Sequence, residues 1–159
     1  MLLFSQSFRF LVLLLFVLSC ASTKSTHHSG EKPDFAKIHF LENTTLTEAI
    51  ELAKKEDKPI FIDIYTDWCL PCKVMEEEVY SDRAISRYFN DNFINLKANG
   101  EEDIGNKLAF LFEVKGYPSL IFVDHRGRLI LKHTGGTSSM KFLQLGEKSL
   151  SIFQERKSS

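Results

Sequence analysis

The chain has 159 residues, 43% of them hydrophobic, and a formal net charge of −1, so it is long enough to bury one substantial core. A nearly neutral chain with interspersed charges lacks the basic surface that nucleic-acid binding requires, and we expect no nucleic acid among its partners. Two of its three cysteines, Cys69 and Cys72, are separated by two residues.

Residues 1–19 have the features of a secretory signal. Arg9 is the only charged residue there, and residues 10–18 form an apolar run that is too short to span a bilayer of about 30 Å. The run leads into Ser19 and Cys20, which resembles the bacterial lipoprotein signal, in which the cysteine becomes the acylated first residue of the mature chain. The alternatives are cleavage at an ordinary small-x-small site, which discards Cys20, and an uncleaved anchor.

Residues 20–34 are small and polar and include Gly30 and Pro33, a composition typical of a flexible tether. The remaining residues, 35–159, are then expected to form one folded domain. If Cys20 is acylated or removed, no unpaired thiol is left outside the pair at 69 and 72, and a spare thiol would be a liability in an exported protein.

Hydrophobic periodicity predicts alternating strands and helices along the domain. The helix expected at 46–56 has apolar residues at i, i+3, i+4 and i+7, and Gly146 is expected to weaken, and to be able to break, the last helix. In chain order we expect a strand (35–41), a helix (46–56), a strand (60–65), two helical pieces (70–80 and 84–89), a strand (93–98), a helix (about 104–112), two strands joined as a hairpin (119–123 and 129–132) and a helix (140–153).

The two cysteines lie where the strand at 60–65 passes into a helix. The unpaired N–H groups and the dipole of a helix start favour a thiolate, so the pKa of Cys69 should lie below that of a free thiol. Cys72, one turn further along, could then attack the same sulfur and release a mixed disulfide. A zinc site is the alternative, but a second pair of ligands with the required spacing is missing.

Residues 59–136 resemble the thioredoxin superfamily. The resemblance is carried by Asp63 within a strand, by the motif Trp-Cys-Leu-Pro-Cys-Lys at 68–73, by Gly-Tyr-Pro at 116–118 before a hairpin, and by the glycine pair at 135–136. The stretch at 67–82 is most similar to exported bacterial thioredoxin-like domains, such as the C-terminal domain of the transmembrane disulfide reductase. The resemblance implies an α/β fold with a central mixed β-sheet and helices on both faces.

The resemblance also implies roles for individual residues. Cys69 would be the attacking nucleophile and Cys72 the resolving thiol. Asp63 would be a buried carboxylate that helps to move the Cys72 proton, with a strand-edge aspartate facing water as the alternative. Ile62 and Ile64 should then point to the opposite face from Asp63.

The loop before the hairpin is implied to bind substrate. Pro118 would be a cis-proline beside the cysteines, and the backbone of Tyr117 would hydrogen-bond an extended substrate segment. Trp68 would either shield the cysteine pair or anchor the core. Asn95 or Lys97 could take the place of the active-site lysine of some thioredoxins, and the run 76–78 is expected to be a solvated helix face.

Together these features predict a thiol–disulfide oxidoreductase that reduces or isomerises disulfides in exported proteins, with reduction favoured over oxidation. It would need no cofactor beyond the Cys69–Cys72 disulfide and no metal. Its partners would be its disulfide-containing clients, an upstream thiol electron donor and, through a lipid on Cys20, a membrane of the bacterial envelope facing the periplasm. The alternatives are a Cu(I) delivery protein and a docking module with idle thiols.

Overall fold

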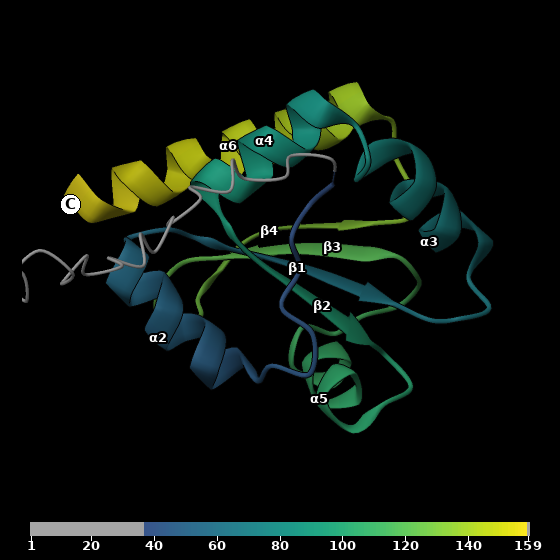
Figure 1. The fold of residues 1–159 in the computed structure, drawn as a ribbon. Helices are drawn as coiled ribbons and strands as arrows, with labels where there is room; N and C mark the ends of the chain where they lie inside the picture. The colour runs from purple at the N-terminus through teal and green to yellow at the C-terminus, as the bar shows by residue number, and fades with distance from the viewer. Residues whose placement is uncertain (1–36, 159) are drawn as a thin grey trace, which may run out of the picture. The chain divides into compact units, whose positions relative to one another are not determined.

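A computed structural model describes residues 37–158, whose centre is a four-stranded sheet in the order β2-β1-β3-β4. The strands are β1 (Ile60–Tyr65), β2 (Ile94–Asn99), β3 (Ser119–Val123) and β4 (Leu129–Thr134). β1 runs parallel to β2 and antiparallel to β3, and β3 and β4 form an antiparallel hairpin. The sheet is therefore mixed, as the sequence predicts (Figure 1).

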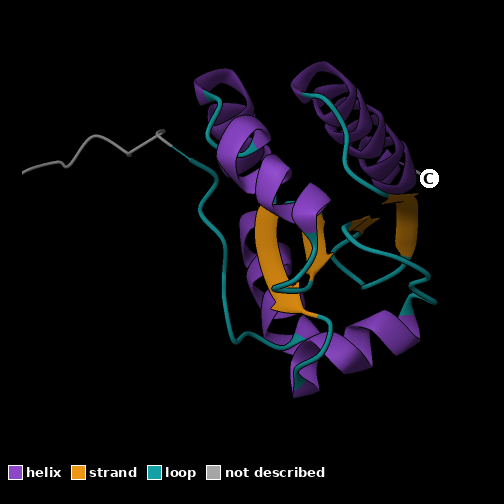
Figure 2. Cartoon of the chain, turned by 90° about the vertical axis from the view of Figure 1, so that its right-hand side faces the viewer, coloured by secondary structure: helices purple, strands orange, loops and turns teal. Residues whose placement is uncertain are grey.

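Helices cover both faces of this sheet. The helical elements are α2 (Leu46–Glu56), α3 (Leu70–Val74), the π-helical turn η1 (Met75–Val79), α4 (Arg83–Asn92), α5 (Asp103–Leu111) and α6 (Ser139–Ser158). Helices α4 and α6 lie side by side over one face, and α2 and α5 lie over the other; Figure 2 shows the strands enclosed between helices. The predicted α/β, thioredoxin-like architecture is confirmed.

The alternation of side chains along β1 divides the interior into two cores. Phe61 belongs to a mostly aromatic cluster under α4 and α6. Ile60, Ile62 and Ile64 belong to an aliphatic cluster under α2 and α5. Asp63 shares the Phe61 face, so Ile62 and Ile64 point away from it, as expected.

Local sequence explains how the helices begin. Thr45 caps α2: its side chain accepts the N–H of Glu48, and the Glu48 carboxylate accepts the N–H of Thr45, which satisfies two donors at the helix start. Asp82 caps α4 by accepting the N–H groups of Ala84 and Ile85. Because η1 begins at the residue that follows the end of α3, the helical segment after β1 is continuous from Leu70 to Val79.

Two expectations about the elements are wrong. A strand does not form in the described part of 35–41: only Leu41 makes an isolated parallel bridge, to Leu96 of β2. Gly146 does not break the last helix, which runs on to Ser158, because Gly146 lies against the ring of Phe89 and is part of the α4–α6 contact.

The predictions of a signal segment at 1–19 and of a tether at 20–34 fall on residues that lie outside the described range, as do residues 35 and 36 of the domain. Within residues 37–158, every helix is too short or too polar to cross a lipid bilayer.

Candidate active site

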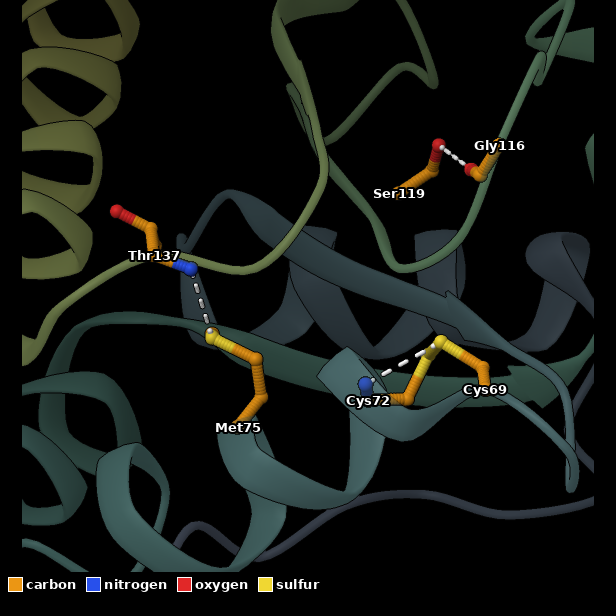
Figure 3. Close-up of a disulfide and its surroundings, with 6 residues drawn as sticks. All are labelled: Cys69, Cys72, Met75, Gly116, Ser119 and Thr137. Carbon is orange, nitrogen blue, oxygen red and sulfur yellow. Dashed lines mark hydrogen bonds between the residues drawn. A yellow bond between two sulfur atoms is a disulfide. The ribbon is translucent and has the colours of Figure 1, made fainter.

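Cys69 and Cys72 form a disulfide at the start of α3 (Figure 3). Cys69 is the N-cap of the helix, and its Sγ accepts a hydrogen bond from the backbone N–H of Cys72 at 3.2 Å. The two Cα atoms are 5.3 Å apart, a separation usual for a disulfide. Pro71 in the first turn removes a donor that the helix would leave unused.

This arrangement presents Cys69 to the positive end of a helix, as predicted. The N–H that now contacts the Cys69 Sγ would stabilise a thiolate at the same atom after reduction. Both cysteines are buried, with Cys69 3% and Cys72 7% exposed. The roles of nucleophile and resolving thiol remain predictions, because the pair is oxidised here.

The loop before β3 lies opposite the disulfide. The Tyr117–Pro118 peptide bond is cis, in agreement with the resemblance. The Pro118 carbonyl accepts the N–H of Gly135, and the Ser119 hydroxyl donates to the Gly116 carbonyl, so both ends of the loop are held (Figure 3).

A groove of about 400 Å³ separates this loop from the cysteine motif, and Cys69, Leu70 and Tyr117 are among its lining residues. Gly100 lets the Tyr117 ring lie there, because a Cβ at position 100 would be 2.6 Å from the Tyr117 hydroxyl. The groove borders Cys69 on the side of the loop, where the resemblance to the thioredoxin superfamily predicts an extended substrate segment.

Trp68 stands at the rim of this groove. Its side chain is 66% exposed, which rules out the alternative of a core anchor. Its Nε1 donates to Glu101 Oε1 at 2.9 Å, and its ring meets the Tyr117 ring edge-on with centroids 5.9 Å apart. Trp68 and Tyr117 thus line one groove with Cys69, and the part of these two residues and of Pro118 in substrate binding remains a prediction.

Asp63 is fully enclosed in the sheet, with 2% of its surface exposed, so the alternative of a strand-edge aspartate facing water is wrong. Burial raises the pKa of Asp63 to about 7, and the Lys97 charge and the nearby Tyr80 hydroxyl oppose that rise. The hydroxyl of Tyr80 and Oδ1 of Asp63 both lack a well-formed hydrogen bond among the described residues.

Asp63 and Cys72 line the same hollow of about 200 Å³, together with Lys73, Glu76 and Lys97. A carboxyl group with a pKa near neutrality can take up or release a proton at physiological pH. The hollow therefore places a candidate proton acceptor on the Cys72 side of the disulfide, opposite the groove that serves Cys69.

Lys97, rather than Asn95, lies beside Asp63, while its correspondence to the active-site lysine of some thioredoxins stays a prediction. Lys97 of β2 is the register partner of Asp63 in β1, whereas the Asn95 amide donates to the Phe89 carbonyl. The Lys97 ammonium forms an ion pair with Glu76 and lies 4.8 Å from the centroid of the Tyr65 ring.

Glu76 corrects the expectation of a solvated acidic run at 76–78. It is partly buried and paired with Lys97, while Glu77 and Glu78 are exposed. The π-helical turn η1 changes which residues face the sheet, and this change leaves no signal in the local sequence pattern. Among residues 37–158, clusters of three or more His, Cys, Asp and Glu side chains suited to a metal ion do not occur.

A cysteine pair that closes into a disulfide at a helix start, next to an open groove, is equipped to exchange disulfides with another protein. The fold and this site support the class of thiol–disulfide oxidoreductases. A family model described as Thioredoxin-like matches residues 41–125, and the chain therefore belongs to the thioredoxin-like family.

The chain is similar to part of much longer proteins. It is 31% identical over 97 residues to the thiol:disulfide interchange protein DsbD of Salmonella typhi, a match that covers 58% of this chain and 17% of that protein. It is 33% identical over 98 residues to the protein of the same name from Yersinia pestis strain Pestoides F, covering 58% and 16%. The match thus spans about a sixth of the length of these relatives.

Solved structures agree in fold. A putative disulphide-isomerase from Bacteroides thetaiotaomicron shares 32% identity at a TM-score of 0.65, with 72% of this chain and 94% of that chain covered. The oxidised C-terminal domain of DsbD from Neisseria meningitidis has 21% identity and a TM-score of 0.55, with coverages of 65% and 90%, and it supports the fold alone.

Proposed function

We propose that the protein reduces or isomerises disulfides in exported bacterial proteins through the Cys69–Cys72 pair. The observation that carries this proposal is the disulfide at the start of α3, with the Cys72 N–H on the Cys69 Sγ and the groove beside it. The names of the relatives, a thiol:disulfide interchange protein and a putative disulphide-isomerase, point to the same chemistry.

The reaction begins from the dithiol form. The Cys69 thiolate attacks one sulfur of a client disulfide, and the other client sulfur leaves as a thiolate that takes a proton from water. Cys72 then loses its proton to the Asp63 carboxylate and attacks the Cys69 Sγ. This step breaks the mixed disulfide, returns the Cys69–Cys72 disulfide and releases the second client sulfur as a thiolate. That thiolate takes a proton from water, Asp63 returns its proton to water, and the client is left with two thiols.

An electron donor must then restore the dithiol. Two electrons and two protons are needed for each turnover, and a dithiol protein acting upstream can supply both by the same exchange chemistry. The client segment enters the groove between Leu70 and Tyr117. There the backbone next to Pro118 is available to bind it as a short added strand.

A trapping experiment tests the proposal. In the Cys72→Ser variant the mixed disulfide cannot be resolved, so clients should accumulate as covalent adducts of Cys69 and can be identified after purification under non-reducing conditions. The Cys69→Ser variant is the matched control and should capture no client. Equal capture by both variants, or none by either, would contradict the assignment.

Reduction is the direction that we propose. Cys-x-Pro-Cys resembles the reducing members of the superfamily, and equilibration of the Cys69–Cys72 pair against glutathione buffers measures the preference. Because about 30 mV corresponds to a tenfold change in equilibrium for this couple, the measurement separates the alternatives well. A potential as oxidising as about −120 mV, the value typical of a strong oxidant, would overturn the reductase proposal.

We also propose that the protein is held at a bacterial membrane, facing the periplasm, by a lipid on Cys20. The sequence of residues 1–20 supports this, with 1–19 as the signal and 20–34 as the tether. Growth with an alkyne-labelled fatty acid should label the wild-type chain and leave the Cys20→Ser variant unlabelled and released from the membrane fraction. Label on the variant would refute acylation at this cysteine.

A further inference from the structure

A basic hollow lies at the end of the sheet that is remote from the disulfide. It measures about 500 Å³ and is formed where the β3–β4 hairpin meets the last turns of α6. Four cationic side chains, one carboxylate and two rings line it: Arg126, Arg128, Arg156, Lys157, Asp124, His125 and Phe153.

Both oxygens of the carboxylate in this hollow already accept hydrogen bonds. Asp124 Oδ1 accepts the N–H groups of Arg126 and Arg128 at 2.9 and 3.0 Å, and its Oδ2 accepts Arg128 Nε at 2.7 Å. Asp124 is only 2% exposed and organises the hairpin from inside. It therefore offsets part of the charge of Arg128 and of Arg156, whose Nη1 lies 3.6 Å from Asp124 Oδ2.

The remaining cations border the opening. Both Nη atoms of Arg156 donate to the Leu129 carbonyl at 3.2 Å, and its one ion pair, to Asp124, is shared with Arg128. Lys157 pairs with Asp57, whose side chain is 59% exposed, so this ion pair is open to solvent and weak. Arg126 is exposed and has no side-chain partner among the described residues. The hollow thus keeps a surplus of positive charge.

We propose that this hollow binds the phosphate group of an anionic phospholipid and turns the redox end away from the lipid surface. Planar guanidinium groups with several N–H donors match phosphate oxygens, and a cluster of cations is drawn to an anionic membrane. This inference rests on the proposed envelope location, since it gives an anchored chain one preferred orientation.

The choice of a membrane over a free phosphate follows from what surrounds the hollow. Two further exposed cations, Lys55 and Lys54, of which Lys54 pairs with Glu51, occupy the last turn of α2 at the same end of the sheet.

The disulfide lies at the opposite end. β1 begins next to the hollow, where Ile60 pairs with Val123, and ends at Tyr65, just before the cysteine motif. Six residues of strand separate the ends by about 20 Å. Figure 1 shows the C-terminus of α6 and α2 at one end of the sheet and α3 at the other.

The test compares binding of the full chain to neutral phosphatidylcholine vesicles and to vesicles that also contain phosphatidylglycerol. The apolar N-terminal run contributes to both, so the measured quantity is the ratio of the two affinities. Arg126→Gln with Lys157→Gln should lower this ratio about thirtyfold, at about 1 kcal/mol for each cation removed. Lys141→Gln with Lys148→Gln, an equal change of charge at exposed positions of α6 outside the hollow, should leave it unchanged.

Three outcomes would overturn the proposal. The first is an equal loss of the affinity ratio in the control pair, and the second is a wild type without preference for anionic vesicles. The third is saturable binding of inorganic phosphate that disappears in the Arg126→Gln, Lys157→Gln variant while the affinity ratio of the vesicles does not change. Both variant pairs should retain wild-type disulfide exchange. A loss of exchange would concern the proposed function, whereas the vesicle ratio concerns only the hollow.

The proposed orientation has its own readout. Trp68 is the only tryptophan of the chain and stands beside the disulfide. With the hollow on the lipid, brominated phosphatidylglycerol should not quench Trp68 fluorescence. Strong quenching would place the redox end on the membrane and overturn the proposed orientation.

Discussion

Asp63 carries a carboxyl group into the interior of the sheet, where an apolar side chain would be more stable. The cost is visible in its raised pKa of about 7, for which burial is the largest cause. The burial of Asp63 Oδ1 without a well-formed hydrogen bond adds to this cost. A carboxyl group that is unfavourable for folding but lines the same hollow as Cys72 fits the proton-transfer role that we propose for it.

Replacing Asp63 by Asn should change how stability depends on pH. Between about pH 4 and pH 7 the unfolded chain has lost this proton and the folded protein still holds it, so the free energy of unfolding falls as the pH rises through this window. Above pH 7 the variant should be more stable than the wild type by up to about 4 kcal/mol. Near pH 4 this advantage should vanish.

Guanidinium unfolding of the oxidised proteins at pH 4, 6 and 8 provides the measurement. Asp67→Asn, an exposed change of the same kind, should retain the wild-type dependence on pH. If Asp63→Asn also retained the wild-type dependence of stability on pH, the group responsible for that dependence between pH 4 and pH 7 would not be Asp63.

Lys97 and Glu76 should tune Asp63 in opposite directions. The lysine charge lowers the pKa of the Asp63 carboxyl and the glutamate charge raises it. We therefore expect Lys97→Met to move the Asp63 titration to higher pH and Glu76→Gln to move it to lower pH. Carbon-13 NMR of the Asp63 carboxyl follows both shifts directly, and shifts of the same sign would contradict this electrostatic picture.

The sequence predicts the residues of the site better than their contacts. Cys69, Pro118 and Asp63 can be located because each belongs to a local motif. The pairing of Lys97 with Glu76 cannot be predicted locally, since it joins β2 to η1 across 21 positions and requires the parallel register of β1 with β2. The exposure of Trp68 likewise depends on the loop that carries Glu101, which local periodicity does not describe.

At the scale of the elements, α6 is held by a close approach to α4. The rings of Phe89 and Phe142 stack with their centroids 4.1 Å apart, and Gly146 lies beside them. A Cβ at position 146 would be 2.9 Å from Phe89 Cζ and 3.3 Å from Tyr88 Cε1. Since Phe89 is completely buried, its ring has little room to give way.

Gly146→Ala should therefore destabilise the protein, although Ala is the better helix former by about 1 kcal/mol. We expect a net loss of about 1 to 3 kcal/mol, the usual cost of overpacking, in denaturant unfolding. Gln144→Ala, an exposed position two residues earlier, should change stability little. If Gly146→Ala raised the stability instead, α4 and α6 would be able to move apart at little energetic cost.

The bounds of some elements can be read directly from the sequence. The strands expected at 60–65 and 119–123 have those bounds in the structure, because short runs of β-branched and aromatic residues end at turn residues. Gly146 is the opposite case, because its low helix propensity, a local property, predicts a weak point in the last helix. Its packing against α4 is a tertiary contact that the local sequence does not reveal. The segment before α2 fails as a strand because only Leu41 reaches the ladder of β2.

Across the whole of residues 37–158, the two cores share one sheet. Phe142 lies on the aromatic side and is completely buried. Phe142→Ala should cost about 3 to 5 kcal/mol, while unfolding followed by fluorescence and by circular dichroism stays a single coincident transition, because β1 and β3 belong to both cores. Phe110→Ala, at a position 85% exposed on α5, is the matched control with little expected effect.

Separate transitions in the Phe142→Ala variant would show that the aromatic and aliphatic sides of the sheet come apart independently. The expected single transition instead reflects the continuous contacts of the central strands, whose residues contribute to both clusters.

The hydrogen bonds of residues 37–41 determine where mechanical load enters the domain. The side-chain amide of Asn90 in α4 bonds the backbone at Lys37 and His39, and the Ile38 N–H donates to the Tyr80 carbonyl. A pull applied at Lys37 therefore acts on these contacts before it reaches the two hydrogen bonds between Leu41 and β2. The strand β1 is bonded to β2 along its whole length, so we expect residues 37–41 to detach before the strand that precedes the cysteine motif is disturbed.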